Sequence, residues 1–190
     1  MKNIKELKDK FENKRPVSWE MIPDIPLNKN QVVMYMPRQL VGTEGDDDIT
    51  AAMINNYIKD EVMPRANGKT YGREHIAYLT AISVLKKSLQ VKDIKALIEL
   101  SENGRQASER YSAFNEMLDK ELSEVSGMLK DGMSEEELTE LALKLAISVY
   151  ARRALCEQIV ECLTAERKEK KEEKKEKPKE VKNKAKGVND

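Results

Sequence analysis

The chain has few of the residues from which catalytic and metal sites are usually built. Its 190 residues include one histidine, two cysteines and one tryptophan, and aromatic side chains make up 5% of the total. The histidine, His75, follows Glu74 at the start of a predicted helix, where packing or helix capping is the expected role. We find no pairing of a nucleophile with a base, no metal-ligand spacing and no phosphate-binding loop. The sequence therefore predicts no enzyme, no metal and no cofactor.

Long apolar runs are also missing. No stretch approaches the roughly 20 apolar residues that a bilayer-spanning helix needs. The N-terminus, Met-Lys-Asn-Ile-Lys-Glu-Leu-Lys, lacks the apolar core of a signal peptide. We expect a cytoplasmic protein without membrane contact.

The two cysteines, Cys156 and Cys162, fall in one predicted helix. Their spacing separates them by about 240° around the helix axis, so they cannot bridge or chelate one ion within that helix. A buried, reduced state is expected for both, and the alternatives are metal or redox sensing and a cysteine pair across a dimer.

The chain has no excess of charge, because 34 basic groups balance 34 acidic groups. Nucleic-acid-binding proteins are often strongly basic, so any attraction to DNA must be local here. Charged residues amount to 36% of the chain, which indicates long solvated helices. The length suits a domain of about 100 residues with a helical extension.

Residues 50–60, TAAMINNYIKD, have the pattern of a short amphipathic helix. At about 100° per residue, the side that a helix buries carries Met53, Ile54, Tyr57 and Ile58. The opposite side carries Ala52, Asn55, Asn56 and Lys59. Those residue types suit the major groove, where Asn pairs with adenine, Ala contacts a thymine methyl group and Lys reaches a phosphate. An ordinary exposed helix face is the alternative.

A basic hairpin is predicted directly after this helix, over residues 64–71. Pro64 prevents the helix from continuing, and Asn67-Gly68 is the strongest short signal for a two-residue hairpin turn. Arg65 and Lys69 flank that turn, as expected of a wing that contacts DNA. A plain solvated hairpin is the alternative.

Two further helices are predicted after the hairpin. Gly72 can cap the first, which begins near Arg73 and has a broad apolar side. The second runs from Val91 to Leu100, with Ile94 on its inner face.

Three motifs in this region carry a resemblance to a known family. They are WExIPDIPL (19–27), MINNYIK (53–59) and KxYxREHIA (69–77). On these motifs the chain is similar to the bacterial family filed as domain of unknown function 1836, over roughly residues 15–100. That family resembles the MerR-type winged helix-turn-helix. The resemblance implies a mainly α fold with a small β-hairpin wing, and double-stranded DNA as the partner.

The resemblance also implies roles for single residues. Asn55 stands where MerR-type proteins usually place a groove-facing arginine, Tyr57 at an aromatic position near the phosphates and Lys59 at another basic position. With the residues that the pattern singles out, the expected DNA-binding set is Thr50, Asn55, Asn56, Tyr57, Lys59, Arg65, Lys69 and Arg73. Asp46 to Asp48, Glu61 and Gly72 depart from the usual pattern, which bears on affinity more than on fold.

The N-terminal segments are predicted to support this domain. Residues 2–13 have the spacing of a short amphipathic helix, either docked or frayed, and Pro16 ends it. Residues 19–27 carry two prolines and should be extended, with Trp19 packed on the winged domain.

Asn28 and Gln31 stand in capping-box spacing and predict the start of a supporting helix. Its inner face is formed by Val32, Tyr35 and Met36. Pro37 should end or kink this helix. One extra turn is expected around Gln39-Leu40, followed by a mobile acidic loop over residues 42–48.

The pattern changes to two long helices beyond Asn103-Gly104. One helix is expected over residues 106–130, and Ser134 with Glu137 caps the last one. Apolar residues of the last helix recur three and four apart: Leu138, Leu141, Leu145, Val149, Cys156, Ile159 and Leu163. The stripe of such a helical hairpin is either internal packing or a dimer seam. We favour a homodimer through the C-terminal helices, which would present two recognition helices to a palindromic site.

The expected organisation has four parts. They are an N-terminal amphipathic helix (1–14), a winged helix-turn-helix domain (15–102), a C-terminal α-helical hairpin (103–166) and a charged tail (167–190). From Glu166 the chain has 11 Lys or Arg and 7 Asp or Glu, and after Pro178 we expect disorder.

The predicted function is a DNA-binding transcriptional regulator with a recognition helix over 50–60 and a basic wing over 64–71. The alternative is a protein–protein interaction module on a winged-helix scaffold without DNA binding. No motif in the sequence indicates a small-molecule effector.

Overall fold

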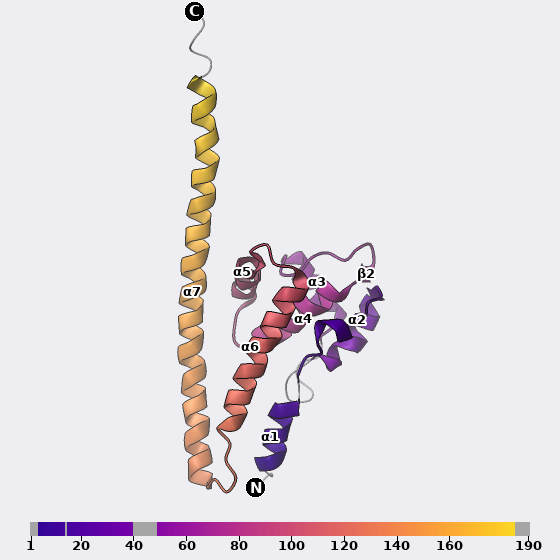
Figure 1. Ribbon diagram of the computed structural model, residues 1–190, viewed down its shortest axis with the longest axis vertical. Coiled ribbons are helices and arrows are strands. Elements are labelled where there is room, and N and C mark those ends of the chain that lie inside the picture. The colour runs from indigo at the N-terminus through magenta and orange to yellow at the C-terminus, as the bar shows by residue number, and fades with distance from the viewer. Residues whose placement is uncertain (1–3, 14, 40–48, 185–190) are drawn as a thin grey trace, which may run out of the picture.

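The computed structural model describes residues 4–13, 15–39 and 49–184. As predicted, this part of the chain is mainly α-helical, with a small two-stranded antiparallel sheet (Figure 1). In chain order, with η for a 3₁₀ helix, the elements are α1 (Ile4–Asn13), η1 (Trp19–Met21), β1 (Leu27–Asn28), α2 (Lys29–Tyr35), η2 (Met36–Arg38), α3 (Ala51–Lys59), β2 (Thr70–Tyr71), α4 (Arg73–Leu85), α5 (Val91–Glu102), α6 (Ala107–Gly127) and α7 (Glu135–Lys184).

The core lies between the small sheet, helices α2 to α5 and the start of α6. Its fully buried side chains include Val32, Met36, Ile54, Ile76, Leu79, Ile82 and Ile94. These are positions that helical periodicity assigns to the inner faces, so the predicted burial of α2 to α5 is confirmed. Tyr111 near the start of α6 belongs to the same core.

Helix α1 is docked on α6 (Figure 1). The Ser126 hydroxyl donates to the Glu12 carboxylate at 2.9 Å. Just beyond α1, the Arg15 guanidinium pairs with Asp119 at 2.6 Å. These contacts hold the N-terminal helix against the middle of the chain.

The segment 19–27, expected to be extended, begins instead with the turn η1. The Met21 N–H donates to the Ser18 carbonyl at 3.0 Å and closes this turn. The turn places Trp19 against Tyr111, with ring centroids 6.0 Å apart. Proline restricts only the residue before it, so Pro23 makes Ile22 extended, with ψ of 135°, and leaves residues 19–21 free to turn.

The capping box that starts α2 is confirmed. The Gln31 N–H donates to the Asn28 side chain at 3.1 Å, and the Asn28 N–H donates to the Gln31 side chain at 2.8 Å. An extra turn, η2, directly follows α2 and has Gln39 as its C-cap. Pro37 has the fixed φ of a first helical turn and lacks only an N–H that such a turn leaves unpaired, so the turn forms around it. Leu40 and the acidic loop over 42–48 lie outside the described residues.

The hairpin differs in detail from the prediction. Asn67 and Thr70 exchange both backbone hydrogen bonds, at 3.0 and 3.1 Å, so the central turn residues are Gly68 and Lys69 rather than Asn67 and Gly68. Gly68 has φ of 66°, which a first central residue of a type II′ turn requires. Strand β2 pairs with β1, Leu27 opposite Tyr71, and meets the residues after Pro64 in a single bridge, Thr70 with Asn67. Proline has no N–H to donate to a neighbouring strand, which explains why the residues directly after Pro64 do not form the second strand of the hairpin.

Helices α4 and α5 lie where the sequence predicts them. Gly72 is the N-cap of α4, and α5 runs to Glu102 instead of Leu100. Asn103 and Gly104 then adopt φ of 20° and 73° and end the helix.

Helices α6 and α7 run in opposite directions on either side of the connection 128–134 (Figure 1). The capping box at the start of α7 is confirmed, with the Glu137 N–H 3.1 Å from the Ser134 hydroxyl and the Ser134 N–H 2.7 Å from the Glu137 carboxylate. Helix α7 continues through Pro178 to Lys184, which includes part of the segment expected to be disordered.

Helix α7 packs along α5. The Arg167 guanidinium donates to the carbonyl oxygens of Glu99 and Leu100, at 2.8 and 3.1 Å. An ion pair of 2.8 Å between Arg152 and Glu121 links α7 to α6. The contact with α5, rather than a continuous seam with α6, positions this helix.

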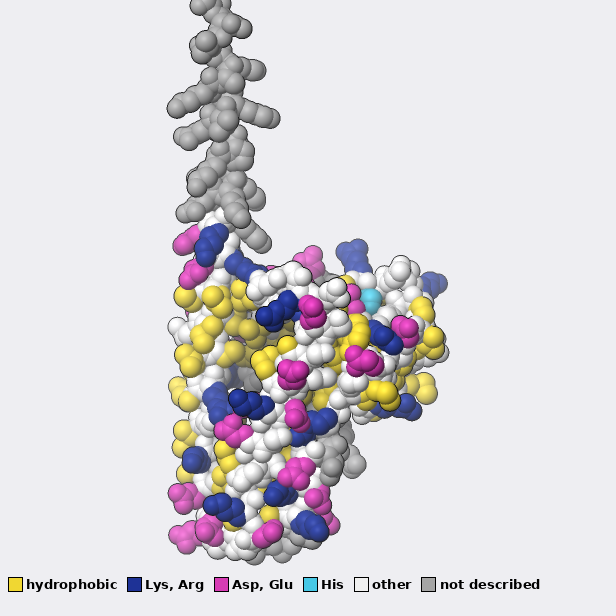
Figure 2. Space-filling model, viewed as in Figure 1, with side chains coloured by type: hydrophobic (Ala, Val, Ile, Leu, Met, Phe, Trp, Pro, Cys, Tyr) yellow, Lys and Arg dark blue, Asp and Glu magenta, His cyan; other side chains and the backbone are white. Residues whose placement is uncertain are grey.

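Much of the apolar surface of α7 is left uncovered by the chain. In the predicted stripe, Val149, Ile159 and Leu163 are all exposed. A second row, absent from the prediction, runs along another side of the helix: Leu143, Ile147 and Tyr150, of which Ile147 is 60% and Tyr150 76% exposed. Figure 2 shows apolar side chains along the outer edge of this helix.

The two cysteines of α7 are free thiols. Cys156 is half-buried, whereas Cys162 is exposed, so the expected burial is wrong for Cys162. Helix α7 contacts the rest of the chain along one side only, and Cys162 lies about 240° around the axis from Cys156.

Candidate nucleic-acid interface

Helix α3 presents the face that the sequence predicts. The Met53 N–H donates to the Thr50 hydroxyl at 3.2 Å, which makes Thr50 the N-cap. Ile54 and Tyr57 point into the core. The opposite face is exposed and consists of Ala52, Asn55, Asn56 and Lys59. This face therefore carries amide donors and acceptors, a methyl group and a cation, the groups that read base edges and phosphates.

Lys29, the first residue of α2, joins this face although the sequence analysis did not single it out. Its ammonium group donates to the side-chain oxygen of Asn55 at 2.5 Å. Asn28, the preceding residue, pairs with Thr70 in the sheet. Lys29 thus lies where α2, α3 and the hairpin strand meet. The two residues are 26 positions apart, and no local pattern could have indicated their contact.

The hairpin carries two exposed cations, Arg65 and Lys69. Its base is fixed by His75. The Gly72 N–H donates to Nδ1 of the imidazole at 3.1 Å, so Nε2 carries the proton and donates to the Arg65 carbonyl, also at 3.1 Å. The His75 ring also meets the Tyr71 ring edge to face, with centroids 5.3 Å apart. The predicted capping role of His75 is confirmed, and it holds the hairpin against α4.

Two of the residues in the expected set are occupied elsewhere. Tyr57 packs in the core, and burial raises the pKa of its hydroxyl above the ordinary value. Arg73 donates from Nε to the Ile22 carbonyl at 3.0 Å and lies 3.6 Å from the Asp24 carboxylate. Arg73 therefore fastens the segment before β1 to α4. Neither side chain belongs to the exposed face of α3.

The end of α3 brings two acidic residues close to this face, Asp60 and Glu61. Glu61 has φ of 56°, a left-handed conformation that is unusual for a residue with a Cβ. Its carboxylate lies 2.9 Å from the Lys95 ammonium group, and this hydrogen bond lowers the pKa of Glu61. Lys95 on α5 therefore offsets one of the two charges that would repel a phosphate.

The exposed face is thus small and modestly basic. Lys29, Lys59, Arg65 and Lys69 contribute the cations, and Asp60 contributes an anion. Elsewhere on the face of the molecule in Figure 2, Lys and Arg are interspersed with Asp and Glu. Binding to a polyanion must therefore depend on a few aligned side chains rather than on the field of the whole protein.

In the part of the chain that the structure describes, no helix combines the length and the apolar character needed to cross a membrane. No three His, Cys, Asp or Glu side chains there are grouped closely enough to hold a metal ion.

Comparison with known proteins gives one match. None of the curated proteins and none of the solved structures matches this chain. The family described as domain of unknown function (DUF1836) matches residues 17–119, from the residues before η1 to the middle of α6. That match spans more than half of the 190 residues, and the chain therefore belongs to the DUF1836 family.

Proposed function

We propose that this protein is a DNA-binding transcriptional regulator built on a MerR-like winged helix-turn-helix. In this proposal α2 supports α3, and α3 enters the major groove. Asn55 and Asn56 read base edges, while Lys29 and Lys59 approach the phosphates. The hairpin acts as the wing, with Arg65 and Lys69 on the sugar-phosphate backbone.

The observation that carries this proposal is the composition of the exposed face of α3. An ordinary solvated helix needs no particular side chains there. This one has two amides and a lysine on its outer side, with Lys29 hydrogen-bonded to Asn55. The hairpin that follows is held in place through its backbone by His75, which leaves the Arg65 and Lys69 side chains available.

The regulator we propose is a homodimer through α7. The row of Leu143, Ile147 and Tyr150 has the spacing i, i+4, i+7 of a helix-packing seam and is uncovered in the single chain. Burying these side chains against a second copy would remove apolar surface from water. A symmetric dimer would present two α3 helices to half-sites about 34–36 Å apart.

Selection of bound fragments from random and genomic DNA by the purified full-length chain tests the proposal. We expect a palindromic site to be enriched. Titration of that site at two salt concentrations should then show affinity falling as salt rises, by a log–log slope of about 0.9 per phosphate contact. Absence of any enrichment at low salt would contradict the proposal.

One observation favours a second candidate, a protein-interaction module that does not bind DNA. Three apolar side chains on and beside α2 are exposed: Met21, Ile25 and Met34. Tyr35 donates to the Met21 carbonyl at 3.4 Å, which keeps this segment beside α2. Exposed methionines are common on surfaces that bind protein partners. If the selection fails, cross-linking at residue 34 should identify that partner.

A further inference from the structure

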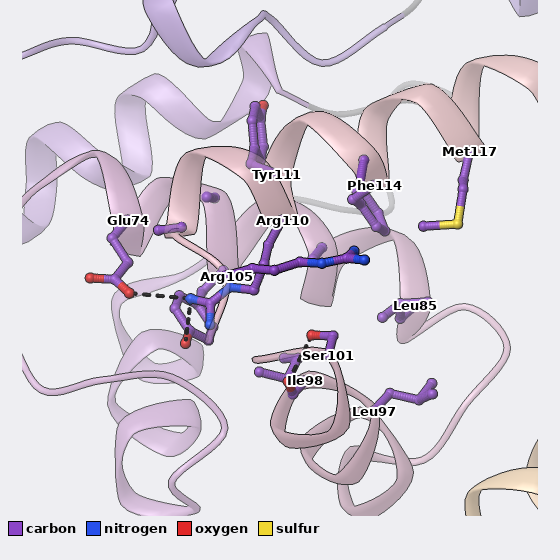
Figure 3. Close-up of a pocket in the computed structure, with 15 residues that line it drawn as sticks. Glu74, Leu85, Leu97, Ile98, Ser101, Arg105, Arg110, Tyr111, Phe114 and Met117 are labelled. Carbon is purple, nitrogen blue, oxygen red and sulfur yellow. Dashed lines mark hydrogen bonds and ion pairs between the residues drawn. The ribbon is translucent and has the colours of Figure 1, made fainter. Parts of the chain in front are cut away.

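A pocket of about 290 Å³ opens between α4, α5 and α6 (Figure 3). Its walls are almost entirely apolar, and their large side chains are Leu85, Leu97, Ile98, Phe114 and Met117. Three small residues explain why the space exists. Ala77 and Ala81, one turn apart on α4, face a wall of α6 that includes Ala113, so these helices leave a gap between them.

One end of the pocket is closed by a satisfied polar network. The Arg110 guanidinium lies 3.5 Å from the Glu74 carboxylate and 3.6 Å from that of Glu102. It also stacks over the Tyr78 ring, 5.8 Å from the centroid. The Tyr78 hydroxyl donates to Glu102 at 3.0 Å, and burial together with this bond raises the pKa of Tyr78 to about 12. At this end each charge already has its partner.

Arg105 has no such partner. Figure 3 shows its side chain extended across the pocket toward Phe114, away from the network around Arg110. Among the described residues, no carboxylate lies within ion-pair distance of the Arg105 guanidinium. The charged side chains that line the pocket are Glu74, Arg105 and Arg110. Arg110 is already paired with Glu74 and Glu102, which leaves the Arg105 guanidinium as the charge available to a ligand.

We propose that this pocket binds a small amphipathic carboxylate, with its apolar part between the helices and its carboxylate on Arg105. A guanidinium matches a carboxylate with two parallel hydrogen bonds. The volume is at the lower end of the roughly 300–1,000 Å³ found for ligand pockets, so the ligand is smaller than a typical drug. The proposal does not depend on DNA binding.

The protein carries its own reporter for this site. Trp19 is the only tryptophan, and its ring centroid lies 6.0 Å from that of Tyr111, which lines the pocket. We would titrate the full-length chain with decanoate below its micelle concentration. The Trp19 fluorescence should change and saturate, and calorimetry should give one decanoate per chain. Decanol should bind roughly tenfold more weakly, and decyltrimethylammonium more weakly still, because neither can pair with Arg105.

Two variants separate the apolar and the charged part of the site. Arg105→Gln changes an exposed side chain, so the fold should be retained. It should weaken decanoate binding roughly tenfold and leave decanol binding unchanged. Ala81→Phe fills the gap between the helices and should abolish binding of both probes. Circular dichroism checks its fold, and Ala113→Phe fills the same pocket from α6 if Ala81→Phe does not fold.

Three results would overturn the proposal. The first is unchanged decanoate binding in both pocket-filling variants, because decanoate would then bind elsewhere, for example on α7. The second is equal binding of decanoate and decanol in the parent and in Arg105→Gln. The third is no decanoate binding together with loss of self-association in Ala81→Phe, which would assign the pocket to a side chain of a second copy.

Discussion

Ile54 on α3 has no exposed surface, whereas Ile147 on α7 leaves 60% of its surface in water. The two residues have the same side chain and both lie on helices with apolar residues at three- and four-residue spacing. The difference comes from the neighbours. Ile54 belongs to a core to which four other helices and the small sheet contribute side chains, from Ile22 to Tyr111. Helix α7, in contrast, meets the rest of the chain mainly along α5.

Apolar stripes therefore have two roles in this molecule, one in packing the core and one in presenting apolar surface to solvent. In the region matched by the DUF1836 family, the apolar inner faces of α2 to α5 pack against one another, and Met21, Ile25 and Met34 are exposed exceptions. On α7 the row of Leu143, Ile147 and Tyr150 finds no partner among the described residues. Large exposed apolar surfaces commonly bind other molecules, so the first region is expected to set stability and the second to set association.

The largest effect should come from truncating the two isoleucines. Ile54→Ala should lower the free energy of unfolding by about 3 kcal/mol, because it removes buried methyl groups and leaves a cavity. Ile147→Ala, measured in dilute solution by urea unfolding, should lower it by less than about 0.5 kcal/mol. Equal losses would mean that α7 is as much a part of the core as α3.

The next effect concerns association. Ile147→Lys should weaken self-association by more than tenfold, because a charge cannot be buried in an apolar seam without a partner. Analytical ultracentrifugation over a range of concentrations measures it. Ser112→Lys, on an exposed position of α6, is the matched control and should associate like the parent. A dimer that survives Ile147→Lys would place the interface elsewhere.

Local signals predicted most of the first region. The helix predicted over 50–60 is found as Ala51–Lys59 with Thr50 as its cap, because a cap and an apolar period are properties of neighbouring residues. The capping box at Asn28, and outside this region the one at Ser134, follow from the same kind of signal. For Tyr57 the periodicity predicted burial and the resemblance predicted a place near phosphates. The structure follows the periodicity.

What the sequence could not predict depends on contacts between distant residues. Three such contacts join segments tens of residues apart. They are the pairing of β1 with β2, the hydrogen bond from Lys29 to Asn55 and the hydrogen bond from Arg73 to the Ile22 carbonyl. The pocket between α4, α5 and α6 results from how far three helices stand from one another, which no single helix encodes. The row of Leu143, Ile147 and Tyr150 on α7 also has helical spacing in the sequence. The prediction followed only the longer apolar stripe on another side of the same helix.

Two exposed amides allow the same comparison at the proposed interface. Asn55 lies on α3 and Gln158 on α7. Asn55→Ala should reduce the preference for the selected DNA over a scrambled sequence by about 1–3 kcal/mol, because a base contact is lost, while general affinity changes less. Gln158→Ala should change neither. Competition binding with the two duplexes measures it, and an unaltered preference in Asn55→Ala would remove this residue from base reading.

The smallest effect, and the most specific one, concerns two exposed lysines. Lys69 occupies the centre of the hairpin turn, and Lys144 lies on the exposed surface of α7. If Lys69 neutralises one phosphate, Lys69→Ala should weaken binding to every DNA sequence alike and reduce the slope of log affinity against log salt by about 0.9. Lys144→Ala removes the same charge from the chain and should leave that slope unchanged. Equal changes in both variants would mean that DNA binding depends only on the total charge of the protein. The hairpin would then not act as a wing.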